Sequence, residues 1–208
     1  KFSKNHTIII SGEIFMIIQD LLERILIDQR LVIIDQNSTA YDAAVTTDSW
    51  SGGGNMITGR HQMAGTGTQN ASLAIGGYNN AIVNSSEEYN GSSWTVGGNI
   101  ITSRFHFNGA AGTQNAAVVF GGYVAPGSSN ATEEYDGSSF TSGNNLITAV
   151  RATQTFIGTQ NAAVSAGGRD GATCHELYNG STWSSQTAVP TNMCCHAGSG
   201  TQNNLFIA

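Results

Sequence analysis

Short apolar runs recur along this chain, and each is bounded by the same polar and glycine residues. The clearest are Ala71–Ile75, Ala116–Phe120 and Ala162–Ala166. Runs of five apolar or alternating residues that end in turn-forming residues are typical of β-strands with a buried face. Each run ends at a double glycine, so the pattern predicts one short strand per repeat that stops at a backbone turn.

The phrase Gly-Thr-Gln-Asn stands directly before each run and occurs a fourth time near the end of the sequence. Its copies begin at Gly67, Gly112, Gly158 and Gly200, which gives intervals of 45, 46 and 42 residues. A period of this length indicates an array of similar supersecondary units. An array places equivalent residues at separate points, whereas catalysis needs dissimilar groups at one point. The repeat therefore favours a protein that is not an enzyme.

A second pattern follows the double glycines and predicts a hairpin. Tyr89, Tyr135 and Tyr178 are each followed by Asn-Gly or Asp-Gly, the dipeptides that favour a two-residue type I′ turn. An aromatic residue lies five positions after each tyrosine: Trp94, Phe140 and Trp183. A two-residue turn puts the members of each aromatic pair at diagonal positions on one face. We expect these pairs to fill the seam between adjacent sheets.

A further repeated motif, Asn-aliphatic-Ile-Thr, precedes the next apolar strand of each unit. It occurs at Asn55–Thr58, Asn99–Thr102 and Asn145–Thr148. Each unit thus contains about four short strands, which fits one blade of a β-propeller. The predicted fold class is therefore all-β.

The order of these signals resembles the kelch repeat of β-propellers. The resemblance rests on the double glycines, the tyrosines and the tryptophans: Gly76, Gly77, Tyr89 and Trp94, then Gly121, Gly122, Tyr135 and Phe140, then Gly167, Gly168, Tyr178 and Trp183. It covers roughly Tyr41–Ala208 and implies a propeller of four-stranded blades with about four repeats visible. The hairpin is tighter and the repeat a little shorter than is usual for the family. The near-verbatim Gly-Thr-Gln-Asn-Ala-Ala phrase, with few lysines, is similar to the simple kelch-like arrays of phage and other viral structural proteins.

The phase of the repeat bears on the number of blades. In three repeats the double glycine begins six residues after the asparagine of the phrase, and after Asn203 this would be residue 209. The fourth unit thus shows only its first two strands, whereas Tyr41–Trp50 has the character of an outer hairpin. Either these halves join and close a four-bladed ring, or the sequence is a fragment of a longer array. The shortfall of one residue favours the fragment.

Residues 1–36 have a different pattern from the repeats. Apolar residues recur there at spacings of four and three, at Ile14, Ile18, Leu21 and Ile25. This predicts an amphipathic helix between residues 12 and 29, which either covers the repeats or joins copies of the chain. Leu31–Ile34 either extends this helix or forms a strand. We divide the chain into a helical docking or oligomerisation segment, 1–36, and the repeats, 37–208.

Composition narrows the class of partner. Charged residues make up 11 % of the chain and the net charge is -6, and from residue 41 onward the only Lys or Arg residues are four arginines. No basic stripe is present, so we expect no nucleic-acid partner. Seven polar or charged residues interrupt the apolar stretch Ile14–Ile34, so we expect no membrane span there.

Metal-ligating residue types gather only near the end of the sequence. They are Cys174, His175, Cys194, Cys195 and His196. Their spacing matches no Cys-x-x-Cys arrangement, and adjacent cysteines rarely bind one ion together. We therefore predict no metal and no cofactor.

Paired carboxylates precede two of the hairpin tyrosines, at Glu87-Glu88 and Glu133-Glu134. Neighbouring strand residues point to opposite faces, so these pairs are not acid–base partners for one bond. The predicted role is solvated charge that discourages pairing at a strand edge. Kelch-like propellers include copper oxidases, but the tyrosines and histidines here do not converge in the repeat pattern.

Two sets of residues are candidates for binding. The first would start the innermost strands and gather at one mouth of a propeller channel: Arg60, Arg104, Arg151 and His196. They either bond to carbonyls and carboxylates of neighbouring blades or bind an anion or a sugar carboxylate. The second set consists of the variable loops after the double glycines, which begin at Tyr78, Tyr123 and Arg169. Variable loops on a constant frame are typical of a recognition surface.

The sequence favours a non-catalytic structural or recognition propeller, such as a component of a phage tail or capsid appendage. The alternative is a secreted or cell-surface propeller that binds glycans, and a third hypothesis is an oxidase-like enzyme. The expected partners are proteins or surface glycans, in a homo-oligomer or larger assembly. The expected location is a virion, the extracellular space or a cell surface.

Overall fold

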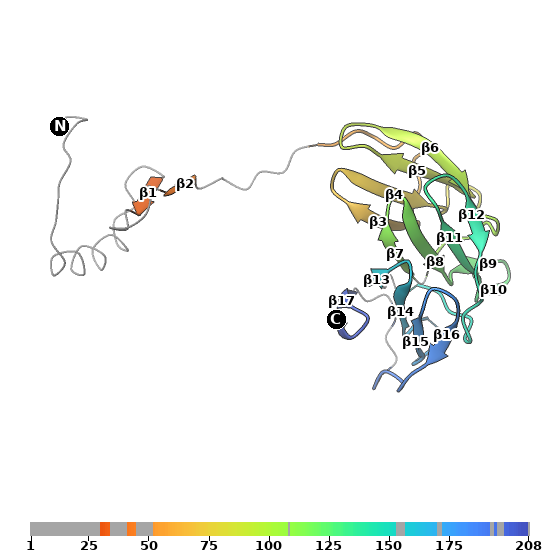
Figure 1. The fold of residues 1–208 in the computed structure, drawn as a ribbon. Coiled ribbons are helices and arrows are strands. Elements are labelled where there is room, and N and C mark those ends of the chain that lie inside the picture. Colours follow the sequence, from red (N-terminus) through yellow and green to blue (C-terminus); the bar gives the residue numbers. More distant parts are fainter. Residues whose placement is uncertain are drawn as a thin grey trace, which may run out of the picture. The chain divides into compact units, whose positions relative to one another are not determined.

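The computed structural model describes residues 30–33, 41–44, 52–107, 109–152, 157–169, 172–191, 194 and 198–207. Within these ranges every regular element is a β-strand (Figure 1). Three sheets contain four antiparallel strands each. The predicted all-β class and the four strands per repeat are therefore confirmed.

Each four-stranded sheet corresponds to one sequence repeat. Sheet 1 contains β3 (Ala64–Thr68), β4 (Ala71–Ile75), β5 (Ser85–Tyr89) and β6 (Trp94–Asn99). Sheet 2 contains β7 (Gly109–Thr113), β8 (Ala116–Phe120), β11 (Thr132–Tyr135) and β12 (Phe140–Ser142). Sheet 3 contains β13 (Gly158–Thr159), β14 (Ala162–Ala166), β15 (His175–Tyr178) and β16 (Trp183–Ser185). In each sheet the spatial order of the strands is their order in the chain.

Three smaller pairs of strands complete the described elements. A two-stranded ribbon of β9 (Tyr123–Val124) and β10 (Gly127–Ser128) lies within the second repeat. The fourth Gly-Thr-Gln-Asn phrase lies in the hairpin of β17 (Gly198–Thr201) and β18 (Asn204–Ile207). Near the start of the chain, β1 (Arg30–Ile33) pairs with β2 (Tyr41–Ala44).

The connections between strands lie at two opposite ends of each sheet. Thr68 pairs with Ala71, so Gln69 and Asn70 of the repeated phrase form the turn from the first strand to the second. The hairpin between the third and fourth strands lies at this same end. The post-glycine loop and the linker from the preceding sheet therefore lie at the opposite end, which we call the loop end.

The hairpins differ from the predicted two-residue turns. Tyr89 pairs directly with Trp94, so four residues connect the two strands. The side-chain Oδ1 of Asn90 accepts hydrogen bonds from the backbone N–H groups of Ser92 and Ser93, at 3.0 and 2.9 Å. This side-chain capping, typical of Asx turns, replaces the type I′ turn. Of the two central residues, only Gly91 has a positive φ, 93°.

Consecutive sheets pack together through their first strands and enclose the core between them. β3 contacts β7, β7 contacts β13, and β13 contacts β17. One buried cluster joins Leu73 and Ile75 of sheet 1 to Val119 of sheet 2. The next cluster joins Val118 and Phe120 of sheet 2 to sheet 3. Because β8 is buried on both faces, its sequence is continuously apolar rather than alternating.

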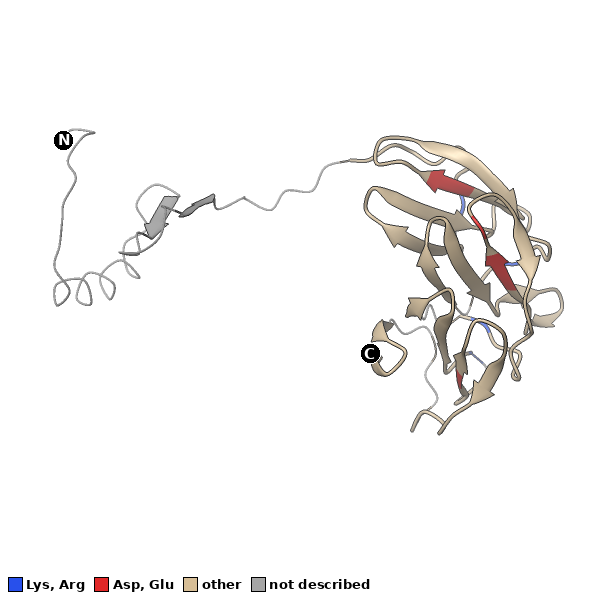
Figure 2. Cartoon of the chain, in the orientation of Figure 1, with Lys and Arg blue, Asp and Glu red and all other residues tan. Residues whose placement is uncertain are grey.

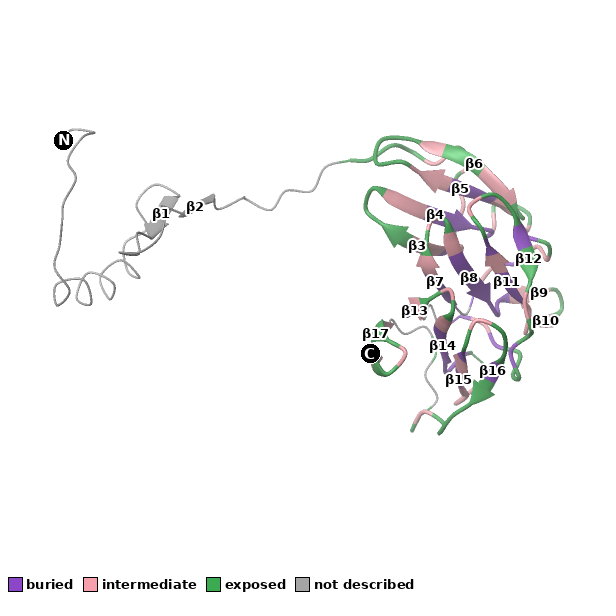
Figure 3. Ribbon diagram, in the orientation of Figure 1, coloured by how far each residue is buried: buried purple, intermediate pink, exposed green. Residues whose placement is uncertain are grey.

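Two of the three aromatic pairs lie in these cores, as the sequence predicts, whereas Tyr89 and Trp94 of sheet 1 are only half-buried, with ring centroids 5.0 Å apart. Ring centroids are 4.5 Å apart for Tyr135 and Phe140 and 4.9 Å apart for Tyr178 and Trp183, and all four residues are buried. Burial is highest on the second strands β4, β8 and β14, whereas β6 has no buried residue and β16 is mostly exposed (Figure 3). The hairpin aromatics thus stabilise the seams between sheets.

The chain divides into two compact units, Lys1–Ser51 and Gly52–Ala208. In the first unit, Arg30–Ile33 is a strand, which is the second of the two alternatives for this stretch. The predicted helix between residues 12 and 29 lies outside the described residues. The predicted boundary between residues 36 and 37 stays a prediction.

Candidate functional site

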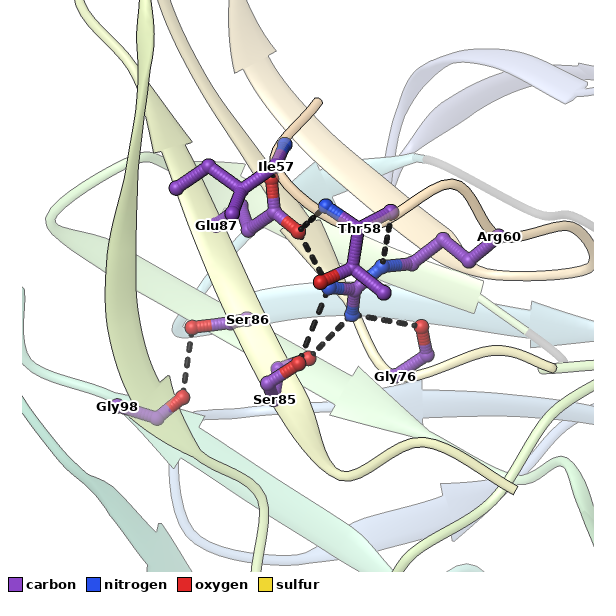
Figure 4. Close-up of polar contacts among 8 residues, drawn as sticks. All are labelled: Ile57, Thr58, Arg60, Gly76, Ser85, Ser86, Glu87 and Gly98. Atoms are coloured by element: carbon purple, nitrogen blue, oxygen red, sulfur yellow. Dashed lines mark hydrogen bonds and ion pairs between the residues drawn. The ribbon is translucent and has the colours of Figure 1, made fainter. Parts of the chain in front are cut away.

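Each sheet buries one carboxylate on its third strand (Figure 2). Glu87, Glu133 and Glu176 are each 1 % exposed, so the prediction of solvated edge charges is wrong for the first glutamate of each pair. Burial is tolerated because the linker that leads into the sheet supplies donors. In sheet 1, Glu87 accepts hydrogen bonds from the backbone N–H groups of Ile57 and Thr58, at 2.7 and 3.0 Å (Figure 4).

An arginine completes this arrangement in two of the three sheets. Arg60 pairs with Glu87 at 2.5 Å and also donates to the carbonyl oxygens of Gly76 and Ser85, at 3.2 and 2.7 Å. Arg104 pairs with Glu133 in the same way, and its side chain is fully buried. Burial lowers the pKa of Arg104, and the adjacent carboxylate opposes that shift. Arg60 and Arg104 therefore bond each linker to the sheet that follows it. We call these buried contacts between linkers and sheets the frame.

The second glutamate of each pair connects neighbouring sheets. Tyr135 of sheet 2 donates its hydroxyl to Glu88 of sheet 1 at 2.5 Å, and Tyr178 of sheet 3 donates to Glu134 of sheet 2 at 2.6 Å. Burial and the carboxylate partner raise the pKa of Tyr135 to about 12. The same causes raise the pKa of Tyr178. These glutamates too have a structural role.

We expect these two tyrosines to make the protein sensitive to alkali. A tyrosine pKa raised above its unfolded value of about 10 means that the folded state holds the proton more tightly. The stabilisation is complete below pH 10 and is lost as the pH rises toward 12. The urea midpoint measured between pH 8 and 11.5 should fall more steeply in the native chain than in a Tyr135→Phe/Tyr178→Phe variant. Equal slopes would contradict this assignment.

The glutamine of the repeated phrase also bridges the sheets. Gln160 donates both hydrogens of its amide to sheet 2, to the carbonyl oxygens of Ala117 and Tyr135 at 3.2 and 3.0 Å. Gln114 and Gln202 make the equivalent pairs of bonds to the sheets before them. The phrase is therefore both a turn and a clamp on the preceding repeat.

Arg151 does not occupy the position predicted for it. The carbonyl of Arg104 accepts a hydrogen bond from Gly77, and the equivalent bond from Gly122 goes to Val150. One additional residue in the third linker thus puts Val150 at the arginine position and moves Arg151 one place further. The guanidinium of Arg151 lies over the ring of Tyr123, with its carbon 4.7 Å from the ring centroid.

Arg151 ends a row of rings at the loop end that pack against one another at tilted or edge-on angles, which we call the aromatic row. Centroid distances are 5.5 Å from His61 to Tyr78, 5.3 Å from Tyr78 to Phe105, and 5.2 Å from Phe105 to Tyr123. All five members are at least partly exposed. Backbone bridges pair His61 with Tyr78 and Phe105 with Tyr123, so linker and post-glycine loop contribute alternately.

The linkers beneath the row are connected to one another. His106 donates its backbone N–H to Gln62 at 3.0 Å, and Ala152 donates to His106 at 2.9 Å. All three have a positive φ, between 49° and 60°. That conformation costs a non-glycine residue about 1–3 kcal/mol and persists only where the surroundings fix it. The row therefore has a rigid base, and such strain is common at binding sites.

Positive charge accumulates beside the row. The pKa of His106 is lowered, first by burial and then by the charges of Arg169, Arg151 and His61. His106 also packs against Phe105 in a tilted arrangement, with 5.0 Å between ring centroids. The loop end thus combines ring faces with cationic side chains, although the chain as a whole is acidic.

The structure therefore rearranges the predicted binding residues. Tyr78, Tyr123, Arg151 and Arg169 lie together at the loop end, whereas Arg60 and Arg104 belong to the buried frame. His196 lies outside the described residues. Sequence reasoning missed His61, Phe105 and His106 as members of the site. Aligning the third linker with one inserted residue would have placed Arg151 beside His61 and Phe105.

Of the five residues of metal-ligating type near the end of the sequence, the structure describes Cys174, His175 and Cys194. No three His, Cys, Asp or Glu side chains gather within the part of the chain that the structure covers. Cys174 donates its thiol to the carbonyl of Gly167 at 3.4 Å. Within the same ranges no helix has the length and apolar character needed to cross a lipid bilayer.

Comparison with known proteins gives no family for this chain. No family model matches the sequence, and no curated protein matches it either.

Proposed function

We propose that this chain is a non-catalytic recognition module of kelch-like propeller type that binds surface saccharides at the aromatic row. Its setting would be a virion appendage or another exterior assembly. The observation that carries the proposal is that one set of polar side chains bonds within the protein and another set faces solvent at the loop end. Glutamates, arginines, tyrosines and glutamines that are buried or half-buried bond the sheets and linkers together, while the row presents partly exposed rings and cations to solvent.

The contacts between the first strands of successive sheets support the propeller fold in this proposal. In a propeller the first strand of each blade lies next to the axis, and successive first strands are neighbours. β3, β7, β13 and β17 contact one another in this order. Thr66 of β3 also donates its hydroxyl to the carbonyl of Gly112 in β7 at 2.8 Å.

The composition of the row supports saccharides as ligands. Sugar rings have apolar C–H faces and polar rims, and exposed aromatic faces beside hydrogen-bonding groups complement both. Tyr78 and Tyr123 supply such faces, and the arginine beside them is suited to a carboxylate because guanidinium binds it through two hydrogen bonds. Acidic saccharides are therefore the ligands that the row fits best.

The proposal predicts a loss of saccharide binding when the row is altered. Tyr123→Ala and Arg151→Ala should each weaken binding of the chain to carboxylate-bearing glycans at least tenfold, because each removes a ring face or a cation. Binding would be measured on an array that pairs acidic glycans with neutral analogues, and then by calorimetry.

A matched control distinguishes binding at the aromatic row from nonspecific binding by other exposed aromatic residues. Phe206 on β18 is 68 % exposed and lies outside the row, so Phe206→Ala should leave binding unchanged. Urea midpoints close to that of the native chain would show that the variants are folded. Unchanged binding in both row variants would rule out the aromatic row as the site. Failure of the native chain to bind any acidic glycan would rule out this ligand class.

A further inference from the structure

Sheet 3 buries a carboxylate without the arginine that accompanies it in sheets 1 and 2. Glu176 accepts backbone hydrogen bonds from Ile147 and Thr148, both at 2.8 Å, as Glu87 and Glu133 do from their own linkers. It is equally buried, at 1 % exposure. Within the described part of the chain, ion pairs between side chains join Arg60 to Glu87 and Arg104 to Glu133, and none reaches Glu176.

The inserted residue in the third linker explains the difference. Val150 occupies the arginine position and packs in the core between sheets 2 and 3, with Ala172 and Cys174 against the same cluster. Cys174 stands where sheet 1 has Ser85, since Gly167 donates to its carbonyl as Gly76 donates to that of Ser85. The space for an internal guanidinium is thus partly filled by apolar groups, and only the carboxylate keeps its polar role.

A cavity opens beside this carboxylate. Its volume is about 370 Å³, within the range of small-molecule sites, and its lining includes Thr148, Cys174, Glu176 and Gln186. Thr148 and Gln186 are exposed, so the cavity is accessible from solvent. In sheets 1 and 2 the carbonyls of Thr58 and Thr102 accept hydrogen bonds from the arginines. Thr148, their counterpart, lines the cavity together with Glu176. The residues equivalent to the two guanidinium acceptors of sheets 1 and 2 therefore both border it.

We propose that this cavity binds a small organic cation, an alkylguanidinium in preference to an alkylammonium, through Glu176 and the Thr148 carbonyl. The ligand replaces from solution the arginine that the other two sheets carry in their own chain. Burying a carboxylate without a counter-charge costs free energy. A cation bound beside the carboxylate offsets much of this free energy.

The preference for guanidinium follows from its shape. A planar guanidinium donates two parallel hydrogen bonds to a carboxylate and has further N–H groups for a carbonyl, whereas an ammonium group acts as a point charge. Burial and the charge of Glu176 raise the pKa of Cys174 to about 11, so this thiol is neutral at pH 7 and adds no second charge. The cavity therefore presents the Glu176 carboxyl group beside a thiol that carries no charge at pH 7.

The test uses butylguanidinium, butylammonium and sodium ions as probes, titrated into the full chain at low salt and followed by calorimetry and by NMR of the amide signals around Thr148. Butylguanidinium should bind saturably and at least tenfold more tightly than butylammonium. An acetyl-Gly-Arg-Gly-amide peptide distinguishes two sources of the group. Binding of the peptide as well would extend the site to an arginine side chain of a partner, and binding of butylguanidinium alone would restrict it to free cations.

Two variants and one control decide the assignment. Glu176→Gln should weaken butylguanidinium at least tenfold, while Asp136→Asn, which removes the same charge from an exposed hairpin loop, should have no effect. Val150→Arg/Cys174→Ser recreates the residues of sheet 1 and should fold with a raised urea midpoint while losing the probe. No saturable binding by the native chain, equal affinity in Glu176→Gln, or undiminished binding by Val150→Arg/Cys174→Ser would overturn the proposal.

Discussion

Replacing Glu133 with glutamine should lower the free energy of unfolding by about 3–5 kcal/mol, the usual cost of leaving one member of a buried ion pair without its partner. The Arg104 side chain has no exposed surface, so water cannot replace the lost carboxylate. Glu133 also accepts backbone hydrogen bonds from Ile101 and Thr102, at 2.7 and 3.1 Å, and a glutamine amide cannot accept through both of its termini. Urea unfolding followed by tryptophan fluorescence would measure the loss.

A double variant separates the ion pair from the rest of the site. Arg104→Met combined with Glu133→Gln removes both charges and should be more stable than Glu133→Gln alone, with a coupling of about 0.5–3 kcal/mol. Asp136→Asn provides the matched control for loss of one negative charge, because asparagine already occupies the equivalent positions 90 and 179. A midpoint for Glu133→Gln equal to that of this control would show that the pair does not hold the frame.

The strands and their order were predictable because they depend on local rules. Alternation, double glycines and the repeated turn residues each act over a few positions, and three copies in phase reinforce one another. The exact hairpin geometry was not predictable by the dipeptide rule alone. Asn90 carries an oxygen that caps two backbone N–H groups, and that side-chain bond competes with the two-residue turn.

The buried charges were missed because alternation gives only the direction of a side chain. Glu87 and Glu88 do point to opposite faces, as predicted, but Glu87 is buried and Glu88 is half-buried. One face meets the linker that carries Arg60, and the other meets Tyr135 of the next sheet. Whether a strand face is covered depends on contacts between repeats, which the local pattern does not contain.

The candidate binding site was predicted in part for a related reason. Tyr78, Tyr123 and Arg169 were identified because their loops vary on a constant frame. Arg151 was assigned to the wrong row because one inserted residue changes its equivalence. Only the hydrogen bonds of the linker backbone, from Gly77 to Arg104 and from Gly122 to Val150, reveal that shift.

Replacing Gln160 with alanine should uncouple sheet 3 from sheet 2 and lower the free energy of unfolding by about 1–3 kcal/mol. The substitution leaves the carbonyls of Ala117 and Tyr135 without their donor at a partly buried seam. In a repeat array, stability is approximately the sum of each repeat and its interfaces with its neighbours. Weakening one interface should therefore broaden the urea transition or divide it into two steps, which fluorescence and circular dichroism recorded together would detect.

Two further variants test whether hydrogen bonding rather than packing is responsible. Gln160→Glu keeps the shape of the side chain but has no N–H group, so it should be at least as harmful as alanine at pH 7. The side chain of Gln186 is exposed and donates to the hydroxyl of Ser184, two residues before it, at 3.2 Å, so Gln186→Ala should change stability by less than about 0.5 kcal/mol. If Gln160→Glu instead retained native stability, the clamp would act through packing alone. The two amide hydrogen bonds of Gln160 would then contribute nothing to the stability of the seam.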